Sequence, residues 1–186
     1  MSHLVFFLEE PSAREMLKGV LPRLIPEHVN VQYIVFEGKQ DLEKRLPIRL
    51  RAWQLPDTVF VVLRDQDSGV CTEIKAGLAE KCHKAGRGDA LVRIACRELE
   101  SFYLGDLAAV EHALGVKNLR RQQSKAKYRM PDRLGSPHQE LKRLAPSYQK
   151  IAGSRAIGPH LAVDENYSHS FKALISGVRQ LLGVTA

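Results

Sequence analysis

The chain has 186 residues, which is enough for one sizeable α/β domain whose core needs no disulfide or metal to stabilise it. Its three cysteines are odd in number and lack the close pairs of zinc sites, so we expect reduced, mostly buried thiols and no structural zinc. The formal net charge is +7. There is no leader-like N-terminus and no apolar stretch near the roughly 20 residues of a membrane span, which predicts a soluble, cytoplasmic protein with no membrane partner.

Two strand–helix units open the chain. Residues 3–8 are apolar and predict a strand that ends on Glu9, and helical spacing follows from Ser12 to Leu24. A second strand over 29–36 leads into a helix over 41–53. Each unit therefore crosses from a strand to a helix through a short polar turn.

The third strand is the most informative stretch of the sequence. Residues 59–63 are apolar without alternation, which is typical of a strand buried on both faces. Asp65 and Asp67 follow, and then Gly69. In a sheet with helices on both sides, ligands bind beyond the carboxyl ends of the strands, so this pattern indicates a metal site more than a simple turn.

The alternation of strands and helices continues beyond this point. The pattern predicts a helix over 71–85, a buried strand over 90–96 and a helix that begins at about Leu99. Asp106 and Ser168 are expected to be the N-caps of two later helices. Four strands alternating with helices predict an α/β fold with a mainly parallel sheet flanked by helices.

We expect a single domain over residues 1–186. Its core would comprise residues 1–115 and the C-terminal helix over 168–183, with a basic, loop-rich insertion over 116–160. The first part of that insertion, up to Pro137, has few apolar anchors and is predicted to be a long loop.

The positive charge is concentrated in this insertion. Residues 117–155 contain eleven Lys or Arg and two acids, a net charge of +9, whereas the rest of the chain has a net charge of −2. Such a division suits a protein that binds a polyanion through one region and divalent metal through another. A solvated basic surface without a ligand is the alternative.

Carboxylates follow three of the predicted strands. Glu9, Asp65, Asp67 and one of Glu98 or Glu100 would converge if those strands are neighbours. Converging carboxylates repel one another unless protons or cations intervene, and hard divalent ions prefer oxygen ligands. The sequence therefore predicts a site for Mg²⁺ or Mn²⁺, able to activate water for attack on a phosphodiester.

Several motifs together resemble a known family. An apolar strand ending in Glu, followed later by a strand ending in Asp-x-Asp-x-Gly, is similar to the Toprim domain of topoisomerases, primases and the overcoming-lysogenisation-defect nucleases. A larger set of motifs comprises Leu8-Glu9-Glu10-Pro11-Ser12, Glu37-Gly38-Lys39, Arg64-Asp65-Gln66-Asp67, Glu98-Leu99-Glu100-Ser101-Phe102-Tyr103-Leu104-Gly105-Asp106 and Lys125-Ala126-Lys127-Tyr128-Arg129. With these motifs the chain more closely resembles the bacterial Toprim-like family DUF4276, whose members often accompany an ATPase in antiphage defence operons.

The resemblance implies a role for each acid. Glu9 matches the Toprim glutamate, a general acid/base or metal ligand, and Asp65 and Asp67 match the metal-binding aspartates. Glu98 or Glu100 matches a further acid of the nuclease branch, with Glu98 slightly preferred because Glu100 falls one residue into the helix. N-capping and favourable interaction with a helix N-terminus are the alternative roles for these acids.

The match departs from the Toprim pattern at one position. Toprim domains commonly have glycine after the first glutamate, whereas this chain has Glu10. The loss of that flexible residue leaves open whether Glu9 or Glu10 faces the metal.

Basic residues in the insertion and one histidine are candidates for contact with phosphate. Lys125, Lys127 and Arg129 belong to the basic motif of the resemblance. His169 follows Ser168 in a polar stretch before the last helix, where N-capping by Ser168 explains most of the pattern. Lys39, in the turn after the second strand, is a weaker candidate for substrate contact.

The sequence leads to one function and two rivals. We expect a Mg²⁺-dependent nuclease that works with an ATPase, with DNA versus RNA and homo-oligomerisation left open. The first rival is a non-catalytic regulatory or nucleic-acid-binding subunit of the same kind of complex. The second is phosphoryl transfer on a free nucleotide.

Overall fold

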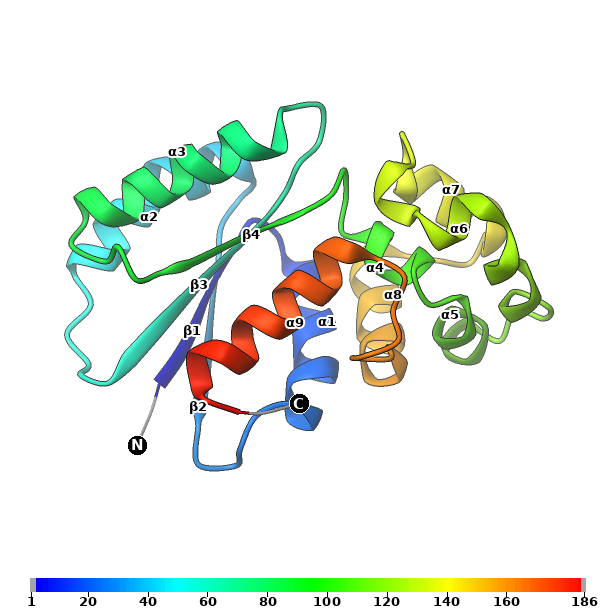
Figure 1. Cartoon of the computed structure of the whole chain (residues 1–186), viewed down its shortest axis with the longest axis horizontal. Coiled ribbons are helices and arrows are strands. Elements are labelled where there is room, and N and C mark those ends of the chain that lie inside the picture. The colour runs from blue at the N-terminus through cyan, green and yellow to red at the C-terminus, as the bar shows by residue number, and fades with distance from the viewer. Residues whose placement is uncertain (1–2, 185–186) are drawn as a thin grey trace.

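A four-stranded parallel sheet lies at the centre of the protein. The computed structural model describes residues 3–184, and the strand order is β2-β1-β3-β4 (Figure 1). All three pairings are parallel, so the carboxyl ends of the strands meet at one edge. The strands are β1 (His3–Leu8), β2 (Asn30–Val35), β3 (Thr58–Asp65) and β4 (Leu91–Ala95).

Two helices cover one face of the sheet. They are α2 (Lys39–Arg51) and α3 (Cys71–Lys84), which lie together on one side of the strands in Figure 1. Leu42, Leu46 and Leu50 of α2 are fully buried, and their spacing of four places them on one helix face. They pack in one core cluster with Val5 and Phe7 of β1.

The opposite face carries a larger core. The alternate β1 side chains Leu4, Phe6 and Leu8 point into it, as the two-residue period of a strand requires. The helices α1 (Pro11–Val20) and α9 (His169–Leu182) pack on this face (Figure 1). The helical part beside them contains α4 (Glu100–Leu104), α5 (Leu107–Leu114), α6 (Ala126–Arg129), α7 (Pro137–Leu144) and α8 (Lys150–Ile157).

The two predicted N-caps are confirmed. The Asp106 carboxylate accepts a hydrogen bond from the Ala109 amide at 3.0 Å, at the start of α5. The Ser168 hydroxyl accepts one from the Phe171 amide at 3.1 Å, at the start of α9. Among the described residues, no helix combines the length and apolar character needed to cross a membrane.

The prediction of a long loop up to Pro137, within a loop-rich insertion over 116–160, was wrong. This stretch folds into short helical turns, η2 (Arg120–Ser124), α6 and η3 (Pro131–Arg133), and α7 and α8 follow them. Tyr128 is fully buried, and the Gln123 side chain accepts from the Leu107 amide and donates to the carbonyls of Leu104 and Tyr128. Turns of three to five residues are too short to show helical periodicity, and contacts distant in sequence hold them in place.

Candidate active site

The ends of β1 and β3 bring Glu9 and Asp65 together. Leu8 pairs with Leu63 in the sheet, so the two chains leave it side by side. The Glu9 carboxylate accepts a hydrogen bond from the Asp65 amide at 3.1 Å. Pro11 begins α1 and restricts Glu10, the residue before it, to an extended conformation at the helix N-cap.

Burial and crowding change the acidity of both carboxyl groups. Burial raises the pKa of Glu9, the Asp65 amide opposes this, and the charges of Asp67 and Glu10 add to it. Burial raises the pKa of Asp65 well above its usual range, and the charges of Glu10, Glu9 and Glu100 act in the same direction. Among the described residues, no group donates a hydrogen bond to the Asp65 carboxylate, which would have stabilised its charged form.

Asp67 lies on the same edge but is paired with a lysine. Its backbone has a positive φ of 54°, and its amide donates to the Arg97 carbonyl at 2.8 Å, which ties the turn after β3 to the chain after β4. The Asp67 carboxylate is 2.7 Å from the ammonium group of Lys39, and this contact raises the pKa of Lys39. Asp67 also contributes to the raised pKa of Glu9.

Glu9 and Glu10 point to different partners. The Glu10 carboxylate accepts from the Ser12 hydroxyl at 2.6 Å and lies 2.6 Å from the Lys150 ammonium group. Glu9 instead contacts the Asp65 amide and lies 3.9 Å from the Arg64 guanidinium. The position of Glu9 therefore suits a ligand at the strand edge better than that of Glu10.

Glu98 and Glu100 also separate. Glu98 accepts from the His138 amide at 2.7 Å, at the start of α7. Glu100 is fully buried, and its Oε1 lies 2.8 Å from His138 Nδ1 and 3.0 Å from the Tyr148 hydroxyl. Its Oε2 is buried without a hydrogen-bond partner among the described residues. The negative charge of Glu100 contributes to the raised pKa of Asp65.

The basic candidates lie on the surface. Lys125, Lys127 and Arg129 are exposed in and just before α6. The Lys127 ammonium lies 2.8 Å from the Glu140 carboxylate and 4.8 Å from the centre of the Tyr128 ring. His169 is exposed at the start of α9 and lines a separate cavity of about 360 Å³ that also contains Cys71 and Cys96.

Sequence reasoning missed three side chains of this region. His138 and Tyr148 contact Glu100, and Lys150 contacts Glu10 and influences Asp65. These contacts join residues 38 to 140 positions apart. No local pattern marks such partners, so the sequence carries no signal for them.

The donor set fits a hard divalent ion. Glu9, Asp65 and Asp67 offer carboxylate oxygens, and a bound cation would offset the burial and the neighbouring negative charges that raise the pKa values of Glu9 and Asp65. In the described residues, no three His, Cys, Asp or Glu side chains already converge on one ion position. Mg²⁺ needs only one or two protein carboxylates, since water and substrate phosphate complete its shell, so Glu9 and Asp65 suffice.

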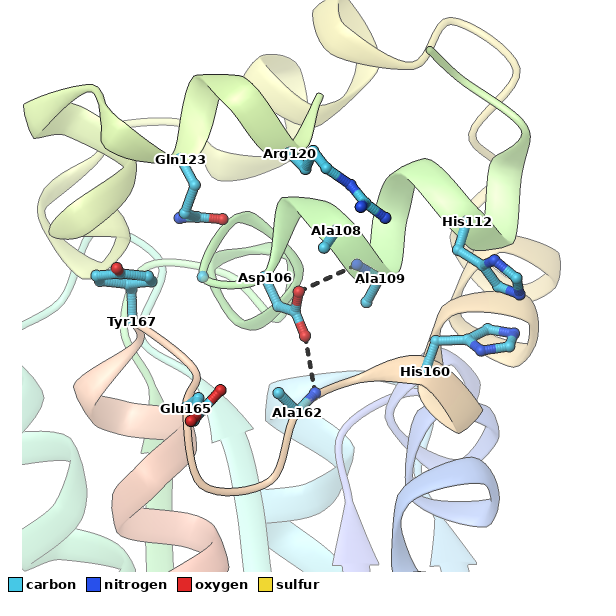
Figure 2. Close-up of a pocket in the computed structure, with 11 residues that line it drawn as sticks. Asp106, Ala108, Ala109, His112, Arg120, Gln123, His160, Ala162, Glu165 and Tyr167 are labelled. Carbon is cyan, nitrogen blue, oxygen red and sulfur yellow. Dashed lines mark hydrogen bonds between the residues drawn. The ribbon is translucent and has the colours of Figure 1, made fainter. Parts of the chain in front are cut away.

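A second polar cavity lies away from this edge. It has a volume of about 520 Å³ and is bordered by α5, η2 and the segment before α9 (Figure 2). Figure 2 shows the His112 and His160 rings side by side, packed edge to face with centroids 4.3 Å apart. The two carboxylate oxygens of Asp106 accept hydrogen bonds from the backbone amides of Ala109 and Ala162. The predicted acids and phosphate-binding residues do not line this cavity.

Comparisons with known proteins agree with this architecture. A family model described as a domain of unknown function (DUF4276) matches residues 8–179. Among solved structures, the chain is similar to the C-terminal region of the Burkholderia pseudomallei OLD protein, with 16% identity and a TM-score of 0.52. The alignment covers 96% of this chain and 98% of that one. A comparison with curated proteins gives no match. The α/β, Toprim-like fold expected from the sequence is confirmed.

Proposed function

The chain belongs to the DUF4276 family, and from that premise we propose that it is a Mg²⁺-dependent phosphodiesterase that cleaves nucleic acid. The observation that carries the proposal is the contact of Glu9 with Asp65 at the carboxyl edge of a parallel sheet, with Asp67 near enough for its charge to raise the pKa of Glu9. Ligands bind at this edge in layered α/β folds. Like charges are held close there, and the Asp65 carboxylate receives no stabilising hydrogen bond from the described residues.

Each residue has a role in this proposal. Glu9 and Asp65 would bind the ion, and Asp67 would become a further ligand once its ion pair with Lys39 is broken. The bound ion would lower the pKa of a water molecule and neutralise charge on the phosphate. Glu100 adds negative charge behind Asp65, and Lys125 and Arg129 would bind the nucleic-acid backbone.

A partner protein belongs to the same proposal. The similar structure is one region of the OLD protein, and this chain covers nearly all of that region. The resemblance of the motifs to DUF4276 proteins that accompany an ATPase leads us to infer an ATPase partner in antiphage defence. Such a partner would control access of nucleic acid to the carboxylate edge.

Two ion pairs favour a second candidate, a non-catalytic nucleic-acid-binding or regulatory subunit. Lys39 pairs with Asp67, and Lys150 pairs with Glu10, so protein cations already neutralise part of the acidic edge. In such a subunit these pairs would be permanent, and the basic segment would dock on nucleic acid or on a partner.

A cleavage assay separates the two candidates. The wild-type protein, D65N and D67N would be tested on DNA and RNA oligonucleotides with Mg²⁺, Mn²⁺ or EDTA. D89N makes the same chemical change at an exposed position before β4, at the opposite end of the strands, and is the matched control. We expect metal-dependent cleavage that falls by about 100-fold or more in D65N and D67N and is unchanged in D89N. Equal cleavage by all four proteins would remove the nuclease proposal.

A further inference from the structure

Lys39 reaches across the carboxylate edge of the sheet. It begins α2, just after β2, whereas its partner Asp67 follows β3. In the sheet order β2-β1-β3, the end of β1 with Glu9 lies between them. The contact of 2.7 Å between Lys39 Nζ and Asp67 Oδ2 therefore spans the end of β1, which carries Glu9.

The backbone fixes the two ends of this contact. Gly38 has a φ of 93°, which favours glycine, and its amide donates to the Glu9 carbonyl at 3.1 Å. On the other side, the Asp67 amide is held by the Arg97 carbonyl at 2.8 Å. The turns that carry Lys39 and Asp67 are thus anchored to the strand ends themselves.

The side chains, in contrast, are free to change partner. Those of Lys39 and Asp67 are 46% and 36% exposed, so their ion pair is screened by water and weak. Lysine carries its charge on a flexible four-carbon stem, and it binds phosphate as a point charge. A divalent ion beside Asp67 would repel the ammonium group, and a substrate phosphate would attract it.

We propose that Lys39 is a substitute cation that neutralises Asp67 in the metal-free protein. When a divalent ion binds Asp67, Lys39 dissociates from this carboxylate and then binds the substrate phosphate. This inference rests on the proposed function and assigns Lys39 two successive partners. A merely structural ion pair would have one partner throughout.

Mn²⁺ binding, followed by electron paramagnetic resonance or calorimetry, tests the first step. K39M removes the charge and keeps an apolar side chain, while K44M makes the same change at an exposed position of the same helix. Loss of the competing ammonium should make K39M bind Mn²⁺ about two- to fivefold more tightly than K44M, as expected for a weak surface pair. D65N is expected to abolish binding.

The second step predicts the opposite effect on catalysis. At saturating Mn²⁺, the single-turnover cleavage rate of K39M should fall at least about tenfold relative to K44M, with partial recovery in K39R. Tighter metal binding together with slower cleavage would support the inference, because loss of a structural pair does not produce this opposition. If K39M and K44M have equal Mn²⁺ dissociation constants and equal cleavage rates, the role of Lys39 is overturned, but the proposed function is not. Absence of Mn²⁺ binding by the wild-type protein would overturn the proposed function, and this inference with it.

Discussion

Asp65 is the residue at which stability and the proposed function are most in conflict. Burial raises its pKa well above the ordinary value of 3.8, so the folded protein retains a proton that the unfolded chain releases. Stability therefore falls as the pH rises from the ordinary value through the raised one. A carboxylate kept at this energetic cost is typical of a functional site.

The first prediction follows from that cost. In EDTA, D65N should be more stable than the wild-type protein at pH 7 to 8, by on the order of 1 kcal/mol, because the amide stays neutral and no hydrogen bond is lost among the described contacts. The difference should shrink toward pH 4, where the wild-type carboxyl is protonated. Urea unfolding across pH measures it, and a D65N protein that is less stable at pH 8 would contradict this account of Asp65.

At the scale of elements, local signals explain what the sequence could predict. The apolar run over 59–63 and the caps Asp106 and Ser168 act over a few residues, and they were confirmed. The turns over 120–133 could not be predicted, because Tyr128 is buried by partners distant in the chain. Tertiary contacts, and not propensity, determine those turns.

Close contact between α1 and the turn after α8 gives the second prediction. Gly19 lies in α1, and a Cβ there would come within 2.4 Å of the Pro159 backbone nitrogen. G19A should therefore destabilise the fold by roughly 1–3 kcal/mol despite a better helix propensity. G77A, in the interior of α3 with no atom within 4 Å of the added Cβ, is the matched control and should be neutral or stabilising by about 0.5–1 kcal/mol. Similar urea midpoints for the two variants would contradict the packing of α1.

Packing of α3 beside β4 gives the third prediction. Cys71 at the start of α3 and Cys96 after β4 line one cavity, and burial raises the pKa of Cys96, with a smaller contribution in the same direction from the nearby Cys71 thiol. Cys82 is buried, which raises its pKa to about 11 and leaves little reactive thiolate. Mild oxidation with diamide should link Cys71 to Cys96 and leave Cys82 reduced, as measured by peptide mass spectrometry. A disulfide that contains Cys82 would show that α3 packs differently.

At the scale of the whole molecule, the sequence predicted that acids follow three strands, but not which strands are neighbours or what each acid contacts. The pairing of β1 with β3 in the sheet brings Glu9 and Asp65 together. The pairing of Lys39 with Asp67, and of His138 with Glu100, depends on how helices and turns pack around that sheet. Side-chain partners set by packing leave no pattern along the chain.

The uneven charge of the molecule gives the last prediction, which concerns salt. If the basic segment binds nucleic acid, K125A and R129A should each weaken binding and reduce the slope of log K against log salt by about 1. K127A should change this slope less, because Lys127 is already neutralised by Glu140. The pKa of Glu140 is lowered to about 2, chiefly by its hydrogen bond with Arg143, so this acid stays charged across the working range.

Fluorescence anisotropy of a labelled oligonucleotide at several salt concentrations measures these slopes. K44A, on the exposed side of α2, is the control for loss of one positive charge away from the segment. Lys125, Lys127 and Arg129 lie within five residues of one another, so a general effect on folding would weaken nucleic-acid binding equally in all three variants. Direct phosphate contact would instead give a smaller change for K127A than for K125A and R129A. Slopes for K125A and R129A that equal that of K44A would place the nucleic-acid interface elsewhere, and the excess positive charge would then be a solvated surface.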